Sequence, residues 1–183
     1  MVMQRYVEPY EDRLESGDTD VVITATQPSR PWIHKSPLFE SRWVCLARRS
    51  HPWLRAPTLE RFVASGHVMV SPTGEGSDPL DPLLAARGLS RTPTVRVPDI
   101  VGALVFAAQT DLLVVVPETT AQRARELLDV DFRRLPLEGT EHTVYMMWHE
   151  SRDNHAPLQW FRSIVEESVR IDIADFQNSG TTC

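Results

Sequence analysis

The chain has 183 residues, of which 42% are hydrophobic and 24% are charged, and its formal net charge is −6. This size and composition suit one soluble globular domain or two small lobes, and the negative charge disfavours direct binding of nucleic acid, which needs a basic surface. No apolar run approaches the roughly 18 residues of a membrane-spanning helix. The acidic N-terminal segment disfavours a secretory signal, and the two cysteines, Cys45 and Cys183, form no disulfide framework, so we expect a reduced, cytoplasmic protein.

The N-terminal part of the chain predicts strands and one short helix. The helix is expected to begin at Pro9 and to end at Gly17, which suits a left-handed C-terminal cap. The expected strands cover residues 2–7, 20–24 and 38–47, with a loop over 25–35. On the third strand, alternate side chains form two faces, one with Trp43, Cys45 and Ala47 and the other with Val44 and Leu46.

From residue 58 to residue 128, short helices and strands alternate. Thr58 is a suitable N-cap for a helix over 59–64, and Gly88 is a suitable end for a helix over 79–87. The strands between the helices cover residues 67–71, 94–97 and 112–116. Because strands that alternate with helices at short intervals pair in parallel through right-handed crossovers, this region predicts a parallel α/β sheet.

The stretch from Val97 to Leu128 contains the clearest of these elements. Asp99 is a suitable N-cap for a helix over 100–109, which is apolar on nearly every side and is therefore expected to pack within a core. The apolar run over 112–116 predicts a strand buried on both faces. Pro117 ends this strand, and the next helix is expected to bury one stripe, formed by Ala121, Ala124, Leu127 and Leu128.

The C-terminal part predicts two strands and one amphipathic helix. The strands cover residues 132–135 and 143–149. The helix covers residues 157–169, and its inward stripe consists of Leu158, Phe161, Ile164 and Val165. Residues 176–183 are expected to form a disordered tail.

Residues 148–155, WHESRDNH, gather histidines and carboxylates of the kind that bind metals. Their spacing fits no strong zinc pattern, so a solvated loop between strand and helix is the favoured interpretation. Cys45 lies within an apolar strand, where a cysteine is a small core residue rather than a nucleophile. No Ser-His-Asp set, carboxylate pair or dinucleotide fingerprint is recognisable, and we therefore expect no catalysis, no cofactor and no bound metal.

Small polar side chains lie at or just after the ends of predicted strands, where α/β sheets bind ligands. These residues are Thr24, Thr26, Ser71 and Thr73. The segment PTGEGSDP, residues 72–79, precedes a helix and resembles an anion cradle, although it lacks the GK[ST] ending of a phosphate loop. Glu75 and Asp78 would repel a polyphosphate, which leaves a carboxylate, a neutral polar ligand or a purely structural turn as alternatives.

Six segments, from about residue 5 to residue 170, form an ordered set. They are LESGDTDVVIT, LFESRWVCLARRSHPW, TLERFVASGHVMVSPTG, LAARGLSRTPTVRVPD, LVFAAQTDLLVVVPETTAQRA and MWHESRDNHAPLQWFRSIV. In order and in spacing they resemble the effector-binding domain of LysR-type transcriptional regulators. The pieces FAAQTDLLVVVP and WHESR are most similar to the branch that contains nodulation regulators.

The resemblance implies an α/β fold of two lobes, of the periplasmic-binding-protein-like type 2, in which two strands cross between the lobes. The crossing strands would be residues 38–47 and 143–149. The effector-binding domain would cover residues 1–175, with lobe I formed by 1–49 and 143–175 and lobe II by 50–142.

The resemblance also implies a small-molecule effector, aromatic or carboxylated, that binds in the cleft between the lobes without catalysis. The implied contacts are small, polar or helix-terminal residues, with one aromatic residue on a crossing strand: Thr24, Thr26, Phe39, Ser71, Thr73, Pro98, Asp99 and Ile100. The implied partners are further copies of the chain or an intact LysR-type regulator. DNA would be bound only through a helix-turn-helix domain, and no membrane is involved.

The chain departs from the family pattern at its N-terminus. The helix-turn-helix, the linker helix and the first strand and helix of the effector domain have no counterpart in it, so we expect an incomplete first lobe with an unpaired sheet edge and exposed apolar surface. The favoured hypothesis is the effector-sensing domain of a regulator. The alternative is a stand-alone module that binds a small ligand or another regulator and does not bind DNA.

Overall fold

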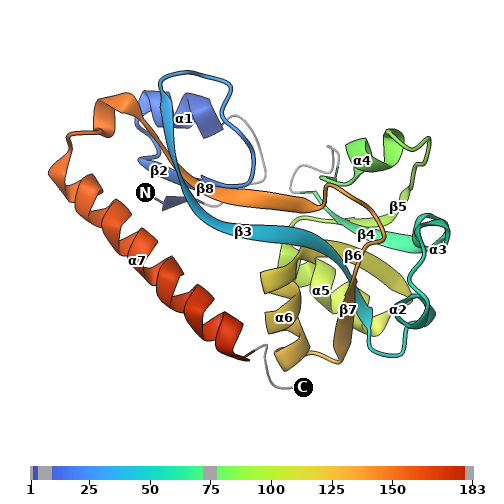
Figure 1. The fold of residues 1–183 in the computed structure, drawn as a ribbon. Helices are drawn as coiled ribbons and strands as arrows, with labels where there is room; N and C mark the ends of the chain where they lie inside the picture. Colours follow the sequence, from blue (N-terminus) through green and yellow to red (C-terminus); the bar gives the residue numbers. More distant parts are fainter. Residues whose placement is uncertain (1, 4–9, 72–77, 180–183) are drawn as a thin grey trace. The chain divides into compact units, whose positions relative to one another are not determined.

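The computed structural model describes residues 2–3, 10–71 and 78–179, and the chain divides into two compact units. Unit 1 comprises residues 1–40 together with 143–183, and unit 2 comprises residues 41–142. Two strands, β3 (Ile33–Arg48) and β8 (Glu141–His149), run through the boundaries and belong to both units (Figure 1). They contain the two segments expected to cross between lobes, although unit 2 begins at Ser41 rather than at residue 50.

Unit 1 contains a small mixed sheet with α1 packed against it. Strand β2 pairs in parallel with β1 and antiparallel with β8. Leu14 of α1 is 2% exposed and packs with Val22 and Met147 of the sheet. Gly17 follows α1 with a φ of +77°, the left-handed conformation that the sequence predicts there. Besides β3 and β8, the elements of unit 1 are β1 (Val2–Met3), α1 (Tyr10–Ser16), β2 (Val21–Thr24), the 3-10 helix η1 (Glu150–Arg152) and α7 (Ala156–Ser179).

Helix α7 is longer than the sequence predicts. The amphipathic stripe predicts a helix over 157–169, whereas α7 continues to Ser179. Residues 176–179, expected in a disordered tail, are therefore helical, and 180–183 lie outside the described residues. Ile164, expected to face inward, is 39% exposed. No helix in the described part of the chain, α7 included, is long and apolar enough to cross a membrane.

The sheet of unit 2 has the strand order β7-β3-β6-β4-β5 (Figure 1). Strand β4 is parallel to both β5 and β6, so the predicted parallel arrangement is confirmed, while β3 is antiparallel to β6 and β7. The remaining elements are α2 (Pro52–Arg55), α3 (Leu59–Ala64), β4 (Gly66–Val70), α4 (Asp81–Ala85), β5 (Pro93–Val97), α5 (Ile100–Gln109), β6 (Leu112–Pro117), α6 (Glu118–Leu127) and β7 (Val130–Arg134).

In unit 2, strands β3 and β6 are buried on both faces, and their alternate side chains enter two separate clusters. One cluster joins Cys45 and Ala47 to α2, α3 and α4. The other joins Val44 and Leu46 to α5 and α6. The two faces predicted for residues 43–47 are therefore confirmed, and β6 divides its side chains between the clusters in the same way.

Two expectations about buried helical side chains are wrong. Helix α5 packs against the core on one side only, where Ala103 and Ala107 are buried and Ile100, Leu104 and Ala108 are partly buried. Its exposed large side chains are Val101, Val105 and Phe106. Leu127, expected on the buried stripe of α6, is 82% exposed. An apolar composition shows that a helix is able to pack, but neighbouring elements decide how many of its sides are covered.

Unit 2 also buries a group of polar side chains. The Arg91 guanidinium, with its side chain 2% exposed, lies 2.6 Å from Asp78 Oδ1 and 3.3 Å from Asp81 Oδ1. His67, which is 1% exposed, donates from Nε2 to the Phe62 carbonyl at 2.8 Å, and Nδ1 is left to accept from Arg91 at 3.4 Å. Burial and the charge of Arg91 lower the pKa of His67 to about 4, so this histidine is neutral at pH 7.

We expect His67 to make the protein less stable as the pH falls. Its pKa of 6.5 in the unfolded chain is lowered to about 4 by folding, so protons taken up between these values favour unfolding and the free energy of unfolding falls by about 3 kcal/mol. In His67→Gln, the amide can still donate to the Phe62 carbonyl, but this part of the pH dependence should be absent. Urea unfolding of both proteins between pH 7 and pH 4 measures the difference.

His155→Gln is the matched control, because His155 is exposed. This variant should keep the pH dependence of the wild type. Burial raises the pKa of Asp78, so the protonation of Asp78 stabilises the folded protein as the pH falls, which is opposite to the effect of His67. Because Asp78 is present in all three proteins, its contribution cancels in the comparison. Equal pH dependence in the wild type and His67→Gln would contradict a neutral, buried His67.

The N-cap of α5 is also open to a direct test. The predicted cap is confirmed, since Asp99 Oδ1 accepts a hydrogen bond of 2.8 Å from the backbone N–H of Gly102. Asp99→Ala removes the acceptor and should lower the free energy of unfolding by about 1 kcal/mol. Asp99→Asn keeps an acceptor and should retain most of that stability. Urea denaturation compares the two variants, and an alanine variant as stable as the asparagine variant would show that the cap contributes nothing.

Candidate functional site

The carboxyl end of β2 brings Thr24 beside Tyr145. The two residues are direct partners in the antiparallel pairing of β2 with β8, so their side chains project to the same face of the sheet. The Thr24 hydroxyl accepts a hydrogen bond of 3.1 Å from the backbone N–H of Thr26, which leaves its O–H as a donor. Thr26 is exposed. Phe39, which lies on β3, is partly buried. Two predicted ligand residues therefore lie together at this strand end.

Gln27 and Lys35 surround Tyr145 with further polar groups. Lys35 Nζ lies 4.7 Å from the centroid of the Tyr145 ring and donates to the side-chain oxygen of Gln27. Side-chain hydrogen bonds with Thr143 and Gln27 lower the pKa of the Tyr145 hydroxyl. The charge of Lys35 also lowers this pKa, and the charge of Glu40 acts to raise it. We call Thr24, Gln27, Lys35 and Tyr145 the β2-end cluster.

Of these four residues, only Thr24 is a ligand contact predicted from the sequence. Lys35 is the single lysine of the chain, Gln27 lies in a predicted loop and Tyr145 lies in a predicted strand, and none of these properties indicates a ligand site. Their meeting depends on the pairing of β2 with β8, for which no local signal exists. The alternation of Thr143 and Tyr145 was the one usable sign, because it places both side chains on one face of a strand.

In unit 2, neighbouring parallel strands bring Ser71 and Pro98 together. Val70 of β4 is the partner of Val97 of β5, and the next residue along each strand is a predicted ligand contact. The backbone N–H of Ser71 donates to the Val97 carbonyl at 2.8 Å, and Ser71 is only 6% exposed. This point is the carboxyl end of the parallel strands, where α/β sheets bind ligands.

Helix α5 begins directly after these strand ends. Asp99 caps the helix. Ile100, the first residue of the helix, is partly buried and packs against the hydrophobic cluster that contains Val44 and Leu46. Both side chains therefore have structural roles in addition to the binding role that the sequence predicts. Asp78, expected to repel a polyphosphate, is paired with the buried Arg91. Thr73 and the turn around it lie outside the described residues.

The predicted ligand residues fall into two groups, one in each unit. Thr24 and Thr26 lie together in unit 1, with Phe39 in the same unit. The group in unit 2 consists of Ser71, Pro98, Asp99 and Ile100. Each group lies mainly at the carboxyl ends of strands, as the order of the elements predicts.

The segment 148–155, rich in histidine and carboxylate, is built into unit 1 by hydrogen bonds. Asp153 accepts from the indole of Trp148 at 2.6 Å, and His34 Nδ1 lies 2.9 Å from its other oxygen. These contacts, led by that of Trp148, lower the pKa of Asp153. His149 caps a short 3-10 helix by accepting from a backbone N–H at 3.2 Å. Among the residues that the structure describes, no group of three or more His, Cys, Asp or Glu is placed to hold a metal ion.

Comparison with known sequences places this arrangement in a family. The family model of the LysR substrate binding domain matches residues 4–170. The HTH-type transcriptional activator NahR of Pseudomonas putida is 28% identical to the chain over 153 residues, which cover 83% of this chain and 51% of NahR. The chain spans about half the length of the curated relatives it matches.

Solved structures match in the same way. The probable transcriptional regulator PA0477 from Pseudomonas aeruginosa has a TM-score of 0.73 and 32% identity, covering 84% of this chain and 51% of that chain. The regulatory domain of MexT, a transcriptional activator in the same organism, has a TM-score of 0.74 and 24% identity, covering 85% and 76%. The fold is thus the periplasmic-binding-protein-like type 2 fold of such regulatory domains. The chain belongs to the LysR substrate-binding domain family, and it is an effector-binding domain of the kind found in LysR-type transcriptional regulators.

Proposed function

We propose that the chain is the sensing part of a transcriptional regulator, which binds a small-molecule effector while a helix-turn-helix region of the regulator binds DNA. The family match over residues 4–170 supports this function. The observation that carries it is the β2-end cluster, which presents hydroxyl, amide and ammonium groups at a strand end, where α/β sheets bind ligands. Such a regulator would act in the cytoplasm as an oligomer, and the exposed apolar side chains of α5 support contact with a second copy.

The described residues favour binding over catalysis. Cys45 is completely buried, and burial raises the pKa of its thiol far above the ordinary value, so it forms no thiolate nucleophile at neutral pH. His67 is buried as well, and its ring nitrogens are engaged with Phe62 and Arg91. The four side chains of the β2-end cluster orient a ligand but include no general base. The Glu40 carboxylate, whose charge acts on Tyr145, accepts a hydrogen bond from Thr143 at 2.7 Å.

A small monocarboxylate is the effector that best fits the β2-end cluster. Lys35 is held by an amide oxygen of Gln27 and by the ring of Tyr145, neither of which neutralises its charge, and no carboxylate of the described residues forms an ion pair with it. A ligand carboxylate would supply the missing negative charge and accept from the Thr24 O–H. The Tyr145 ring would offer an apolar face to an aromatic ligand.

Benzoate and benzamide test this assignment, because they have nearly the same shape and differ in charge. We expect benzoate to raise the melting temperature, to shift the amide NMR signals of Thr24, Thr26 and Gln27, and to bind about tenfold more tightly than benzamide, since a charged hydrogen bond contributes roughly 1.5–3 kcal/mol. Lys35→Met removes the charge and should abolish the preference for benzoate. NMR titrations with both compounds measure the dissociation constants.

Arg55→Met is the matched control, since it removes an exposed cation from α2 in unit 2. It should leave the affinity for benzoate unchanged. Equal binding of benzoate and benzamide by the wild type, or an unchanged preference in Lys35→Met, would reject Lys35 as the anchor. Amide shifts confined to residues outside the β2-end cluster would reject the cluster itself as the effector site.

A further inference from the structure

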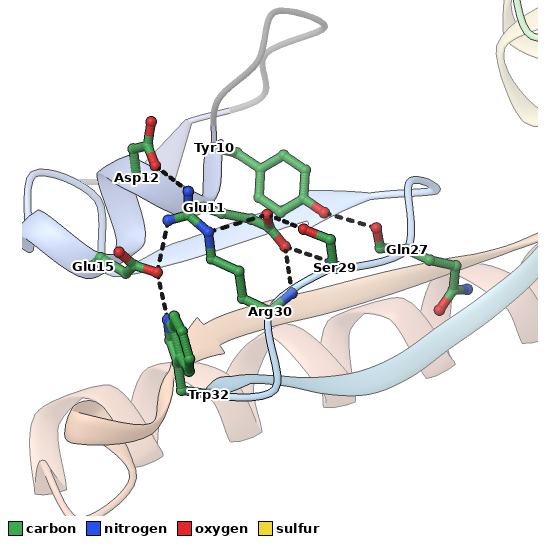
Figure 2. Close-up of polar contacts among 8 residues, drawn as sticks. All are labelled: Tyr10, Glu11, Asp12, Glu15, Gln27, Ser29, Arg30 and Trp32. Carbon is green, nitrogen blue, oxygen red and sulfur yellow. Dashed lines mark hydrogen bonds and ion pairs between the residues drawn. The ribbon is translucent and has the colours of Figure 1, made fainter.

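One carboxylate of α1 holds the backbone of the loop that follows β2, residues 25–32 (Figure 2). Glu11 Oε1 accepts from the backbone N–H of Ser29 at 2.6 Å and from that of Arg30 at 3.2 Å, while Oε2 accepts from the Ser29 hydroxyl at 2.7 Å. The Glu11 side chain is only 14% exposed. Its partial burial acts to raise the pKa of Glu11, but the hydrogen bonds from Ser29 and Arg30 outweigh this and lower it. Glu11 is therefore ionised at neutral pH.

The same helix binds the loop through side chains as well. The Arg30 guanidinium lies near three carboxylates of α1, Asp12 at 2.5 Å, Glu15 at 2.7 Å and Glu11 at 3.7 Å. The indole N–H of Trp32 donates to Glu15 (Figure 2). Asp12 is largely exposed, and ion pairs of this kind contribute little to stability, whereas the contacts of Glu11 reach the main chain directly.

The loop supplies Gln27 to the β2-end cluster. The hydroxyl of Tyr10, also on α1, donates to the Gln27 carbonyl at 3.2 Å (Figure 2). Only Pro28 separates Gln27 from Ser29, and a proline restricts both its own φ and the backbone of the residue before it. A fixed Ser29 therefore limits where Gln27 lies, and the Gln27 side chain contacts Lys35 and Tyr145.

We propose that Glu11 is a positioning residue of the effector site, whose carboxylate holds the 25–32 loop so that Gln27 meets Lys35 and Tyr145. The inference rests on the proposed function, because it assigns Glu11 to the same site. Glu11 acts through the main chain of Ser29 and Arg30 rather than through contact with the effector. When this anchor is absent, the loop must be ordered at the moment of binding, and the ordering lowers the affinity.

Amide hydrogen exchange of the whole chain tests the anchor without any ligand. In Glu11→Gln, which removes the charge at nearly constant shape, the amides of Ser29 and Arg30 should exchange about tenfold faster. Asp12→Asn is the matched control, because Asp12 is also acidic, lies in the same helical turn and contacts Arg30 only through the side chain. It should change these rates by no more than about twofold. If the amides of β2 exchange at the wild-type rate in both variants, the faster exchange at Ser29 and Arg30 in Glu11→Gln reflects the local loss of the anchor rather than a general loss of stability.

The titration of Glu11 gives a second readout. Because the Ser29 amide donates to the Glu11 carboxylate, its proton signal should follow that titration, with a midpoint below the ordinary pKa of glutamate. The transition should be absent in Glu11→Gln and present in Asp12→Asn. A Ser29 signal that titrates alike in the wild type and Glu11→Gln would overturn the anchor.

Benzoate titration connects the anchor with the site. Glu11→Gln should weaken benzoate binding about fivefold, and Asp12→Asn by no more than about twofold. Unchanged exchange at Ser29 and Arg30 in Glu11→Gln, or equal benzoate affinities of the two variants, would overturn the role of Glu11. If the wild type does not bind benzoate, the proposed monocarboxylate effector fails, and the exchange rates alone decide whether Glu11 holds the loop.

Discussion

The antiparallel pairing of β3 with β6 is the interaction on which unit 2 depends. Val44 and Leu46 of β3 lie opposite Val116 and Val114 of β6, and both strands send alternate side chains into two clusters. If β3 shifted by one residue along β6, each of its side chains would move to the opposite face of the sheet. The side chains that now pack against α5 and α6 would then face α2, α3 and α4 instead. Strand β3 continues into unit 1, where it carries Lys35, so the element that closes the core also contributes to the candidate effector site.

In each unit, a partly or fully buried charged side chain binds a segment that connects helices and strands. In unit 1, Glu11 holds the loop after β2 through main-chain N–H groups. In unit 2, the buried guanidinium of Arg91 holds Asp78, which lies shortly before α4. When one partner of such a buried pair is lost, the other is left without its counter-charge, which destabilises a protein far more than the loss of an exposed ion pair does. In unit 1, the proposed binding group Gln27 therefore depends on a charge, that of Glu11, which does not itself contact the proposed effector.

Local signals in the sequence predicted most helices and strands and most of their buried faces. Thr58, for example, caps α3 by accepting from a backbone N–H at 3.3 Å, as its position before the helix predicts. Local signals did not predict α2, and residues 33–35 of β3 were expected in a loop. The errors arose where the neighbours of an element decide the outcome. Val101 and Phe106 are apolar but exposed, because the sheet covers only the side of α5 that carries Ala103 and Ala107. Composition alone does not reveal this difference.

The order of most elements, the family and the strand ends at which Thr24, Ser71 and Pro98 lie follow from the sequence alone, because they depend on residues that are neighbours along the chain. The tertiary structure decided which charged and polar groups meet at those strand ends. Lys35 contacts Tyr145 across a large separation in sequence, and Glu11 contacts a loop beyond the next strand. Such contacts depend on strand pairing and helix packing, which have no signature within any one segment of the chain.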